Sequence, residues 1–464
     1  MSFYSTLFVL FMIAVFLIYW EIPHKYRWIF LSIANAVFYL CFDVRFILVL
    51  LFITLFTYTM GILFEKKKLP GYVFFIVILV TLSMLLIFKY LNFVIYTFAK
   101  ISSITGIALQ ASTLKLIMPV GISFYTFESL SYLCDIRKGK IKAEKNILKY
   151  WIFLSFFPNI TSGPIERADH FISQLTEEKV FDYDTAKYGM RLLLFGLFKK
   201  LVCADLMVKY INNVFDNVIA HSGTVFIIAI FMYTFEIYFD FSGYTDMARG
   251  IAYLLGFDLL ENFKAPYLAE SIKEFWGRWH ISLSTWLRDY VYIPLGGNRC
   301  SKLRKNINIL ITFFVSGLWH GASFTFIVWG MLHGIVQCIE GKISRFPRII
   351  KQIITFCIVA FAWMFFRINS LSEAVYVIRH MIPSGSLLGA FQAMGMTKLS
   401  IIKCGLCIIF IMVYDILSEK RNILKEMDKL HIVARWLIYA AVAVLTICVH
   451  LHEGSNAAFI YFQF

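Results

Sequence analysis

Long apolar segments recur along the whole chain, and short loops rich in lysine and arginine separate them. Of the 464 residues, 60% are hydrophobic and 16% are charged, whereas soluble domains have about 45–50% apolar and about 25% charged residues. A transmembrane helix needs about 20 mostly apolar residues. The sequence therefore predicts an all-α, polytopic integral membrane protein with about eleven spans. The candidate spans are 3–20, 27–42, 46–64, 72–97, 114–134, 223–256, 305–319, 321–340, 351–367, 399–417 and 433–450.

Two further segments, 148–162 and 187–204, are shorter or interrupted, and we expect re-entrant or interfacial helices there. The long segment 223–256 has room for a bent or broken helix. No internal repeat and no linker to a soluble domain is visible. We therefore expect one membrane domain over residues 1–464, with its motifs concentrated in 118–340.

The basic residues fall in alternate loops between the predicted spans. They are Lys25 and Arg27; Lys66, Lys67 and Lys68; Arg137, Lys138, Lys140, Lys142, Lys145 and Lys149; Lys342, Arg345, Arg348 and Lys351; and Lys420, Arg421, Lys425 and Lys429. The loop at 101–112 carries no charge. Because cytoplasmic loops are enriched in lysine and arginine, this alternation predicts that the N-terminus and the C-terminal tail lie outside the cell.

The same loops explain the net charge of +15 without nucleic-acid binding, which we do not expect. The first apolar segment has no lysine or arginine before it, as a secretory signal would, so we expect an uncleaved first span.

The segment 275–299, FWGRWHISLSTWLRDYVYIPLGGNR, is unusually rich in polar and aromatic residues. Ionisable groups are costly at membrane depth and tend to be functional there. Helical i, i+4 spacing predicts that His280, Ser284 and Arg288 share one face, with Trp276 one turn before His280.

We therefore expect a short helix that is buried in protein or lines a wet cavity. Glu274 and Arg278 are four residues apart and are expected to pair, and Pro294, Gly296 and Gly297 are expected to end the helix in a tight loop. An interfacial amphipathic helix with an aromatic belt is the alternative.

A second histidine lies in GLWHG at 317–321, and GMLHG at 330–334 repeats the pattern around His333. Each is a G-x-x-x-G motif, and small residues at that spacing let helices approach closely. His320 stands in an otherwise apolar stretch, where a neutral imidazole can act as a general base. The alternative is a histidine that only packs between helices.

Three carboxylates, Glu236, Asp240 and Asp246, lie in the apolar segment FEIYFDFSGYTDMARG. They suit a cation site or a proton relay, but we expect structural ion pairs, with Arg249 or Lys264 as partners.

Other chemistry receives no support from the sequence. The C-x-x-C of Cys404 and Cys407 lies in an apolar segment with no second pair, so we expect packing rather than metal binding, and the nine cysteines form no disulfide framework. No H-E-x-x-H, nucleotide-binding or G-x-S-x-G motif occurs. We expect no metal site and no bound cofactor.

The runs WGRWHISLSTWLRDYVYIPLGGNR and GLWHGASFTFIVWGMLHG resemble the membrane-bound O-acyltransferase (MBOAT) family, in particular its bacterial alginate O-acetyltransferase-like branch. The resemblance covers nearly the whole chain. Its other stretches are MPVGISFYTFESLSYLCDI at 118–136, FFPNITSGPI at 156–165, FDFSGYTDMARG at 239–250 and FIYFQF at 459–464.

The resemblance implies site residues, a fold and partners. It implies that His320 is the catalytic histidine, that His280 is the second functional histidine and that helices surround a central tunnel. The other candidates for lining the substrate or tunnel are Trp276, Arg278, Trp279, Ser284, Arg288, Asp289, Trp319 and His333.

The resemblance also implies an O-acetyltransferase of a bacterial cytoplasmic membrane, embedded in membrane lipid. Its donor would be acetyl-CoA, its acceptor an extracytoplasmic polysaccharide, and its partner an extracytoplasmic SGNH-type acetyltransferase. The related D-alanyl transferases of teichoic acids share R-W-H-x-S and W-H-G but lack the run YIPLGGNR, present here at 292–299. D-alanyl transfer and a transporter for polysaccharide or lipid-linked sugar remain the alternatives.

Overall fold

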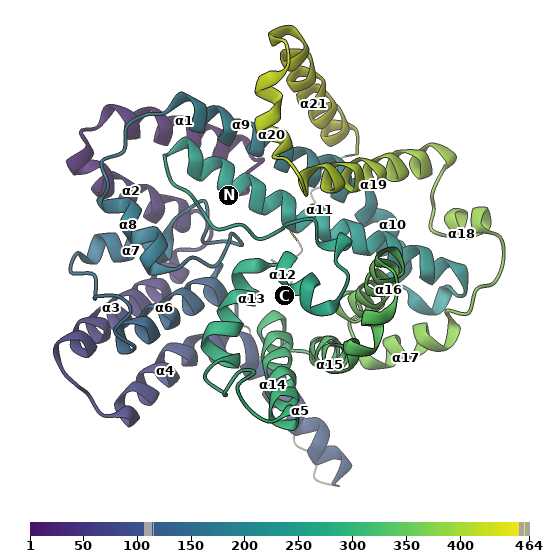
Figure 1. Cartoon of the computed structure of the whole chain (residues 1–464), viewed down its shortest axis with the longest axis horizontal. Helices are drawn as coiled ribbons and strands as arrows, with labels where there is room; N and C mark the ends of the chain where they lie inside the picture. Colours follow the sequence, from purple (N-terminus) through teal and green to yellow (C-terminus); the bar gives the residue numbers. More distant parts are fainter. Residues whose placement is uncertain (106–113, 115, 454–458, 460–464) are drawn as a thin grey trace. The chain divides into compact units, whose positions relative to one another are not determined.

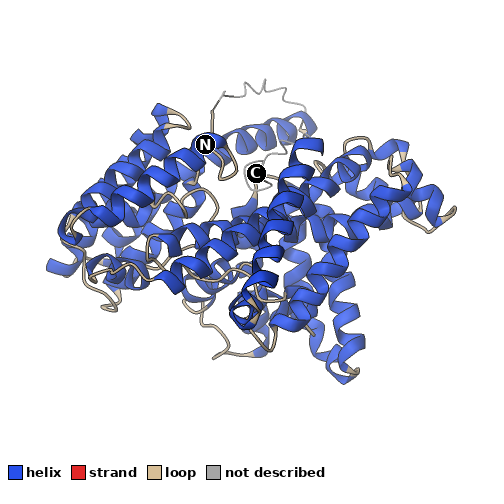
Figure 2. Cartoon of the chain, turned by 90° about the horizontal axis from the view of Figure 1, so that it is seen from above, coloured by secondary structure: helices blue, strands red, loops and turns tan. Residues whose placement is uncertain are grey.

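The computed structural model of the chain describes residues 1–105, 114, 116–453 and 459, and these residues form helices joined by loops (Figure 2). Most of the uncharged loop at 101–112 lies outside the described residues, as does FIYFQF apart from Phe459. Phe263 and Trp279 form an isolated antiparallel β-bridge. The expected all-α class is confirmed.

The chain divides into two compact units. Unit 1 comprises residues 1–189 and 251–260, and unit 2 comprises 190–250 and 261–464. The helices of unit 1 are α1 (Thr6–Glu21), α2 (His24–Leu40), α3 (Val44–Lys66), α4 (Gly71–Leu85), η1 (Leu86–Tyr90), α5 (Leu91–Ile104), α6 (Ile122–Arg137), α7 (Ile147–Ser155) and α8 (Ala168–Thr176) (Figure 1). Helices α9 (Tyr183–Leu197) and α11 (Thr224–Leu254) each contribute to both units.

Unit 2 contains the remaining helices. They are η2 (Phe198–Ala204), α10 (Asp205–Phe215), η3 (Val218–Ala220), η4 (Pro266–Leu268), α12 (Ile272–Arg278), α13 (Ile281–Leu287), η5 (Arg288–Tyr292), α14 (Lys302–His320), α15 (Phe324–Ile339), η6 (Glu340–Arg345), α16 (Arg348–Arg367), α17 (Leu371–His380), α18 (Leu387–Ala393), α19 (Lys398–Ser418), α20 (Ile423–Glu426), η7 (Met427–Lys429) and α21 (Ile432–Glu453).

Six helical segments in the described residues are long and apolar enough to cross a membrane. They are Val44–Lys66, Gly71–Ser103, Thr224–Leu254, Arg348–Arg367, Lys398–Ser418 and Ile432–Leu451. Two shorter apolar helices, α1 and α15, match the predicted spans 3–20 and 321–340. The chain is thus a multi-pass membrane protein, and the number eleven stays a prediction.

The predicted segments differ from the observed helices in two places. Segment 114–134 is helical only from Ile122, because Gly121 adopts a left-handed backbone (φ 76°) where a Cβ would lie 2.1 Å from the carbonyl oxygen of Ile160. Segment 223–256 is one continuous helix, α11, rather than a broken one. The interruption expected within 187–204 is real, since α9 passes into the π-helix η2.

Helices α14 and α15 touch backbone to backbone through glycines, as the G-x-x-x-G motifs predict. A Cβ on Gly317 would lie 2.4 Å from the carbonyl oxygen of Phe326, and one on Gly330 would lie 2.3 Å from that of Phe313. No larger residue fits without moving a backbone. The two glycines therefore fix how closely the helices that carry His320 and His333 approach each other.

We expect Gly330→Ala to lower the unfolding temperature in detergent, because the added methyl group forces α14 and α15 apart at a cost of about 1–3 kcal/mol. Gly405→Ala on α19 is the matched control, since no atom lies within 4 Å of its added Cβ. There the gain in helix propensity should leave stability unchanged or slightly higher. Equal thermal stability of the two variants would contradict the close packing.

Candidate active site

The segment 272–287 is two short helices rather than one, and His280 stands at the break. Helix α12 ends at Arg278, α13 begins at Ile281, and His280 has a left-handed backbone (φ 43°, ψ 52°). The prediction that Trp276 lies one turn before His280 on the same helix is therefore wrong. A β-carbon makes this conformation costly, and strained non-glycine residues cluster at functional sites.

Asn262, which the sequence analysis did not single out, holds the strained turn in place. Its backbone carbonyl accepts from the N–H of Ile281 (3.0 Å). Its side-chain Oδ1 accepts from the N–H of Ser282 (3.2 Å) and from the Ser282 hydroxyl (2.6 Å). These bonds satisfy the first donors of α13. An asparagine in the loop before R-W-H-x-S gave no local signal, since its partners lie about twenty residues further along the chain.

Three histidine side chains gather in unit 2 from three different elements. The ring centroids of His280 and His320 are 6.4 Å apart. His320 is the last residue of α14, and His333 lies on α15. Trp329 packs on both His320 and His333, with ring centroids 4.9 Å and 5.1 Å apart, respectively. The structure thus brings together the two histidines predicted to carry the chemistry.

Aromatic rings cover these histidines. Measured between ring centroids, Phe241 lies 4.7 Å from His280, and Phe366 lies 5.2 Å from His320. The ring of Trp319 packs on both imidazoles, with centroid distances of 5.8 Å to His280 and 4.9 Å to His320. His320 is only 4% exposed and His280 is fully buried. Burying a charge in such surroundings is costly, so the neutral imidazole is favoured. The expected central tunnel stays a prediction, since both rings are almost closed off from water.

The other predicted site residues fall into two groups. Trp276 and Trp279 are buried. The ring of Trp276 packs on that of Trp329 (5.5 Å between centroids), and the ring of Trp279 packs on that of Trp363 (4.9 Å). The hydroxyl of Ser284 donates to the carbonyl of Trp279 (3.2 Å), which supports the turn.

The charged members lie apart from the histidines. Arg278 pairs with Glu274 (2.8 Å), as predicted, and also with Glu419 (2.8 Å). Arg288 pairs with Asp289 (2.8 Å), and its side chain is 59% exposed. Arg288 therefore does not share a buried face with His280. Beyond η5, Gly296 and Gly297 adopt positive φ values in the predicted tight loop.

Two of the three carboxylates of α11, Asp240 and Asp246, form structural ion pairs, but the predicted partners are wrong. Glu236 is buried and forms no ion pair within the described part of the chain. Asp240 pairs with Lys200 (2.6 Å), which also pairs with Asp205 (2.9 Å), and all three side chains are about 97% buried or more. Asp246 pairs with Lys199 (2.7 Å). Both lysines lie in the π-helical turn η2, whose buried position the sequence did not reveal.

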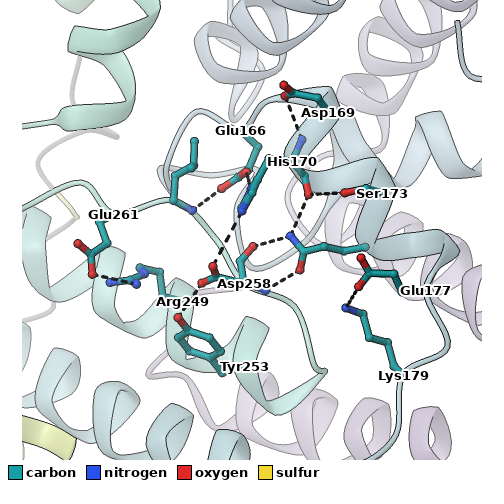
Figure 3. Close-up of polar contacts among 12 residues, drawn as sticks. Glu166, Asp169, His170, Ser173, Glu177, Lys179, Arg249, Tyr253, Asp258 and Glu261 are labelled. Atoms are coloured by element: carbon teal, nitrogen blue, oxygen red, sulfur yellow. Dashed lines mark hydrogen bonds and ion pairs between the residues drawn. The ribbon is translucent and has the colours of Figure 1, made fainter. Parts of the chain in front are cut away.

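The remaining predicted partners behave differently. Arg249 pairs with Glu261 (3.2 Å) instead of a carboxylate on α11 (Figure 3). Nine free cysteines are present, and Cys404 and Cys407 are buried on α19, as expected for packing residues.

Unit 1 holds a second polar cluster that the sequence analysis missed (Figure 3). The Nδ1 of His170 on α8 contacts Glu166 Oε2 at 2.9 Å, and its Nε2 lies 3.9 Å from Asp258. Glu166 also accepts from the N–H of Leu260 (2.7 Å), and Gln174 bonds the backbone of Asp258 in both directions. The cluster ties α8 to the segment after α11. The only sequence signal was the i, i+4 spacing of Glu166 and His170.

These contacts move the pKa values of both groups. The hydrogen bond that His170 donates to Glu166, together with the nearby charges of Glu166, Asp258 and Asp169, raises the pKa of His170 above its ordinary value. Burial raises the pKa of Glu166, and its bond to His170 opposes that rise.

The fold and the site define a class: a helical multi-pass membrane protein with a buried, aromatic-lined histidine cluster. The profile of the membrane-bound O-acyltransferase family matches residues 141–372, which include all three histidines. The chain belongs to this family, and it is an O-acyltransferase.

Three relatives illustrate the range of the family. The chain is 37% identical to a probable alginate O-acetylase of Pseudomonas aeruginosa, over 83% of this chain and 76% of that protein. It is 33% identical to a peptidoglycan O-acetyltransferase of Helicobacter pylori, over 76% and 73%. It is 30% identical to a teichoic acid D-alanyltransferase of Bacillus subtilis, over 54% and 69%.

We expect Lys200→Met to lower the free energy of unfolding by about 3–5 kcal/mol, because it leaves Asp240 and Asp205 buried without their cation. Lys187→Met is the control: its partner Asp184 is 80% exposed, so the loss should be about 0–1 kcal/mol. Denaturant or thermal unfolding in detergent measures both. A Lys200 variant as stable as the Lys187 variant would contradict the pairing.

The raised pKa of His170 predicts a pH dependence of stability. A raised pKa in the folded state stabilises fully below the ordinary histidine value of about 6.5, and the stabilisation disappears as pH rises through the folded value. We expect the unfolding temperature to fall by about 1–3 °C more between pH 6 and 8.5 in the wild type than in His170→Gln.

His431→Gln is the control for this measurement, since His431 is exposed and its Nδ1 accepts from the backbone N–H of Val433 (3.3 Å). Its pH profile should match the wild type. An unchanged profile in His170→Gln would show that the Glu166 contact does not stabilise the protonated ring.

Proposed function

We propose that this chain moves an acetyl group from acetyl-CoA in the cytoplasm, across the bacterial cytoplasmic membrane, toward the hydroxyls of an extracytoplasmic polysaccharide. The observation that carries the proposal is the meeting of His280 and His320, ring centroids 6.4 Å apart, inside the segment that matches the family. Two relatives that cover three quarters or more of the chain are named for O-acetyl transfer. The similarity to the D-alanyltransferase extends over about half of this chain. This difference in coverage favours acetyl over D-alanyl transfer.

The proposed orientation follows the basic loops. The loops with Lys66, Lys67 and Lys68 and with Arg345, Arg348 and Lys351 face the cytoplasm, and both chain ends face outward. This orientation gives the anionic donor an attractive approach on the inner side.

In the proposed reaction, His320 is the general base. Its neutral imidazole takes the proton of the acceptor hydroxyl while the hydroxyl oxygen attacks the thioester carbonyl carbon. The tetrahedral intermediate expels the CoA sulfur, and the imidazolium returns the proton to that thiolate, so the products are an O-acetyl ester and free CoA. General base catalysis of this kind contributes about 10²–10⁴-fold. His280 is a positioning residue, held by its strained turn against Trp319, which packs on His320.

An SGNH-type acetyltransferase outside the membrane is the proposed partner that completes transfer to the polymer. The chain itself offers loops rather than an external domain between its described helices.

A transporter is the alternative class, and the buried Lys200 cluster would suit its proton relay. A transporter requires no acyl donor, so one experiment separates the two.

We expect His320→Asn to reduce O-acetyl groups on the surface polysaccharide by about 10²-fold or more, in cells that express the variant at the wild-type level. Polymer export should be unchanged. His431→Asn is the matched control: it makes the same substitution at an exposed position where asparagine still caps α21, and acetylation should stay normal. Normal acetylation with His320→Asn would refute the proposal, and lost export would favour a transporter.

A further inference from the structure

Two cavities of unit 2 share part of their walls, and His333 lines one of them. The first, about 330 Å³, is lined by Glu270, Ser271, Ile272, Glu274, Val336, Glu340, Gly341, Lys351, Thr355 and Ile358. The second, about 300 Å³, is lined by Leu332, His333, Val336, Cys357, Ile358, Phe361 and Ala362. Val336 and Ile358 belong to both walls, so a charged compartment adjoins an apolar one.

The wall of the charged compartment contains three glutamates and one lysine, and two of the glutamates form ion pairs. Glu270 is neutralised by Lys351 (2.5 Å) and Arg348 (3.3 Å), and Glu274 by Arg278. Glu340 forms no ion pair within the described part of the chain. Its Oε2 accepts from the backbone N–H groups of Ile272 (2.8 Å) and Lys273 (3.4 Å). One carboxylate is therefore left for a cation, and the ammonium of Lys351 stands in the same wall.

The apolar compartment is built for a hydrocarbon chain. It lies between α15 and the membrane-length helix α16, and its lining is aliphatic, aromatic and thiol apart from His333. Its volume is about twice that of a ~150 Å³ cavity known to hold a benzene ring. An acyl chain from the bilayer therefore has both the room and the surroundings it needs.

His333 contributes to this wall without exposing a polar atom. It is 1% exposed, and both of its ring nitrogens are buried away from the cavity. The surface that this cavity offers to a ligand is therefore apolar, as an acyl chain requires.

From this combination we propose that the two cavities bind one phospholipid with a zwitterionic, amine-bearing headgroup, of the phosphatidylethanolamine type. Its ammonium pairs with Glu340, its phosphate with Lys351, and one acyl chain occupies the compartment at His333. An anionic headgroup without an amine leaves Glu340 without a cation. Neither His280 nor His320 lines these cavities, so the lipid site is distinct from the proposed transfer site.

Native mass spectrometry of the delipidated, full-length protein tests the proposal, with dioleoyl phosphatidylethanolamine and dioleoyl phosphatidylglycerol titrated separately. We expect the wild type to retain the ethanolamine lipid about tenfold better, as one charge-assisted contact implies. Glu340→Gln keeps the oxygen that accepts from Ile272 and removes the charge, so it should abolish most of that preference. Glu373→Gln is the control, since this carboxylate also accepts from a backbone N–H (3.2 Å) but lies elsewhere.

Ile358→Trp enlarges a side chain that lines both cavities and should abolish retention, whereas Leu406→Trp on the exposed face of α19 should not. Glycerophosphoethanolamine, the headgroup without chains, should not compete. Equal retention of both lipids by the wild type would overturn the proposal. So would full retention by Ile358→Trp, or full competition by the headgroup alone.

A labelling measurement on the wild type keeps the test independent of variants that fail to fold. Cys357 lines the apolar cavity, and Cys448 is an exposed thiol on α21. N-ethylmaleimide should label Cys357 several-fold more slowly in nanodiscs of the ethanolamine lipid than in the glycerol lipid, with Cys448 unaffected. Equal labelling of Cys357 in both would contradict occupancy by the amine-bearing lipid.

Discussion

The contact of α14 and α15 through their glycines is the constraint on which the histidine cluster depends. Gly317 lies one turn before His320, and Gly330 follows Trp329 directly. Because each glycine faces a backbone carbonyl of the other helix, the helix axes approach closely enough for the rings at 320, 329 and 333 to meet. Small residues drive such packing in membranes, where lipid leaves little hydrophobic gain from association.

Charge within the bundle follows a second rule: a buried ion must find a partner. Helix α11 carries Glu236, Asp240 and Asp246, and its most apolar part is 83% buried, whereas that of α21 is 6% buried. Charged groups are costly where a helix faces lipid. Asp240 and Asp246 occur where Lys200 and Lys199 can reach them, and the π-helical turn η2 presents both lysines to that interior.

The sequence predicted what depends on local pattern. Apolar length located α3, α11, α16, α19 and α21, and the glycine spacing located the close helix contact. The i, i+4 rule found the Glu274–Arg278 pair. Within the candidate site, His280 and His320 were singled out because they lie among apolar segments, and the family resemblance assigned their roles. Their contact is visible only in three dimensions.

What the sequence did not reveal depends on partners distant along the chain. Helical periodicity predicted one helix running through His280. The pattern does not show that the side chain of Asn262 accepts a hydrogen bond from Ser282, which lets a new helix begin after His280. The partner of Asp240 is forty residues away, and nearer cations such as Arg249 looked equally suitable. Glu166 and His170 showed the right spacing, but Asp258 and Leu260, which complete their cluster, follow some ninety residues later.

The aromatic cover over the histidines has opposite effects on an acyl-transfer site. It excludes water, which would otherwise hydrolyse a bound thioester, and it strengthens electrostatic interactions around the imidazole. It also closes His320, at 4% exposure, against any substrate. The proposed reaction therefore requires a ring to move, and Trp319 is the ring that packs on both His280 and His320. Trp319 precedes His320 at the end of α14, and Gly321 then continues in extended conformation, so the helix ends at the two rings that such a movement would involve.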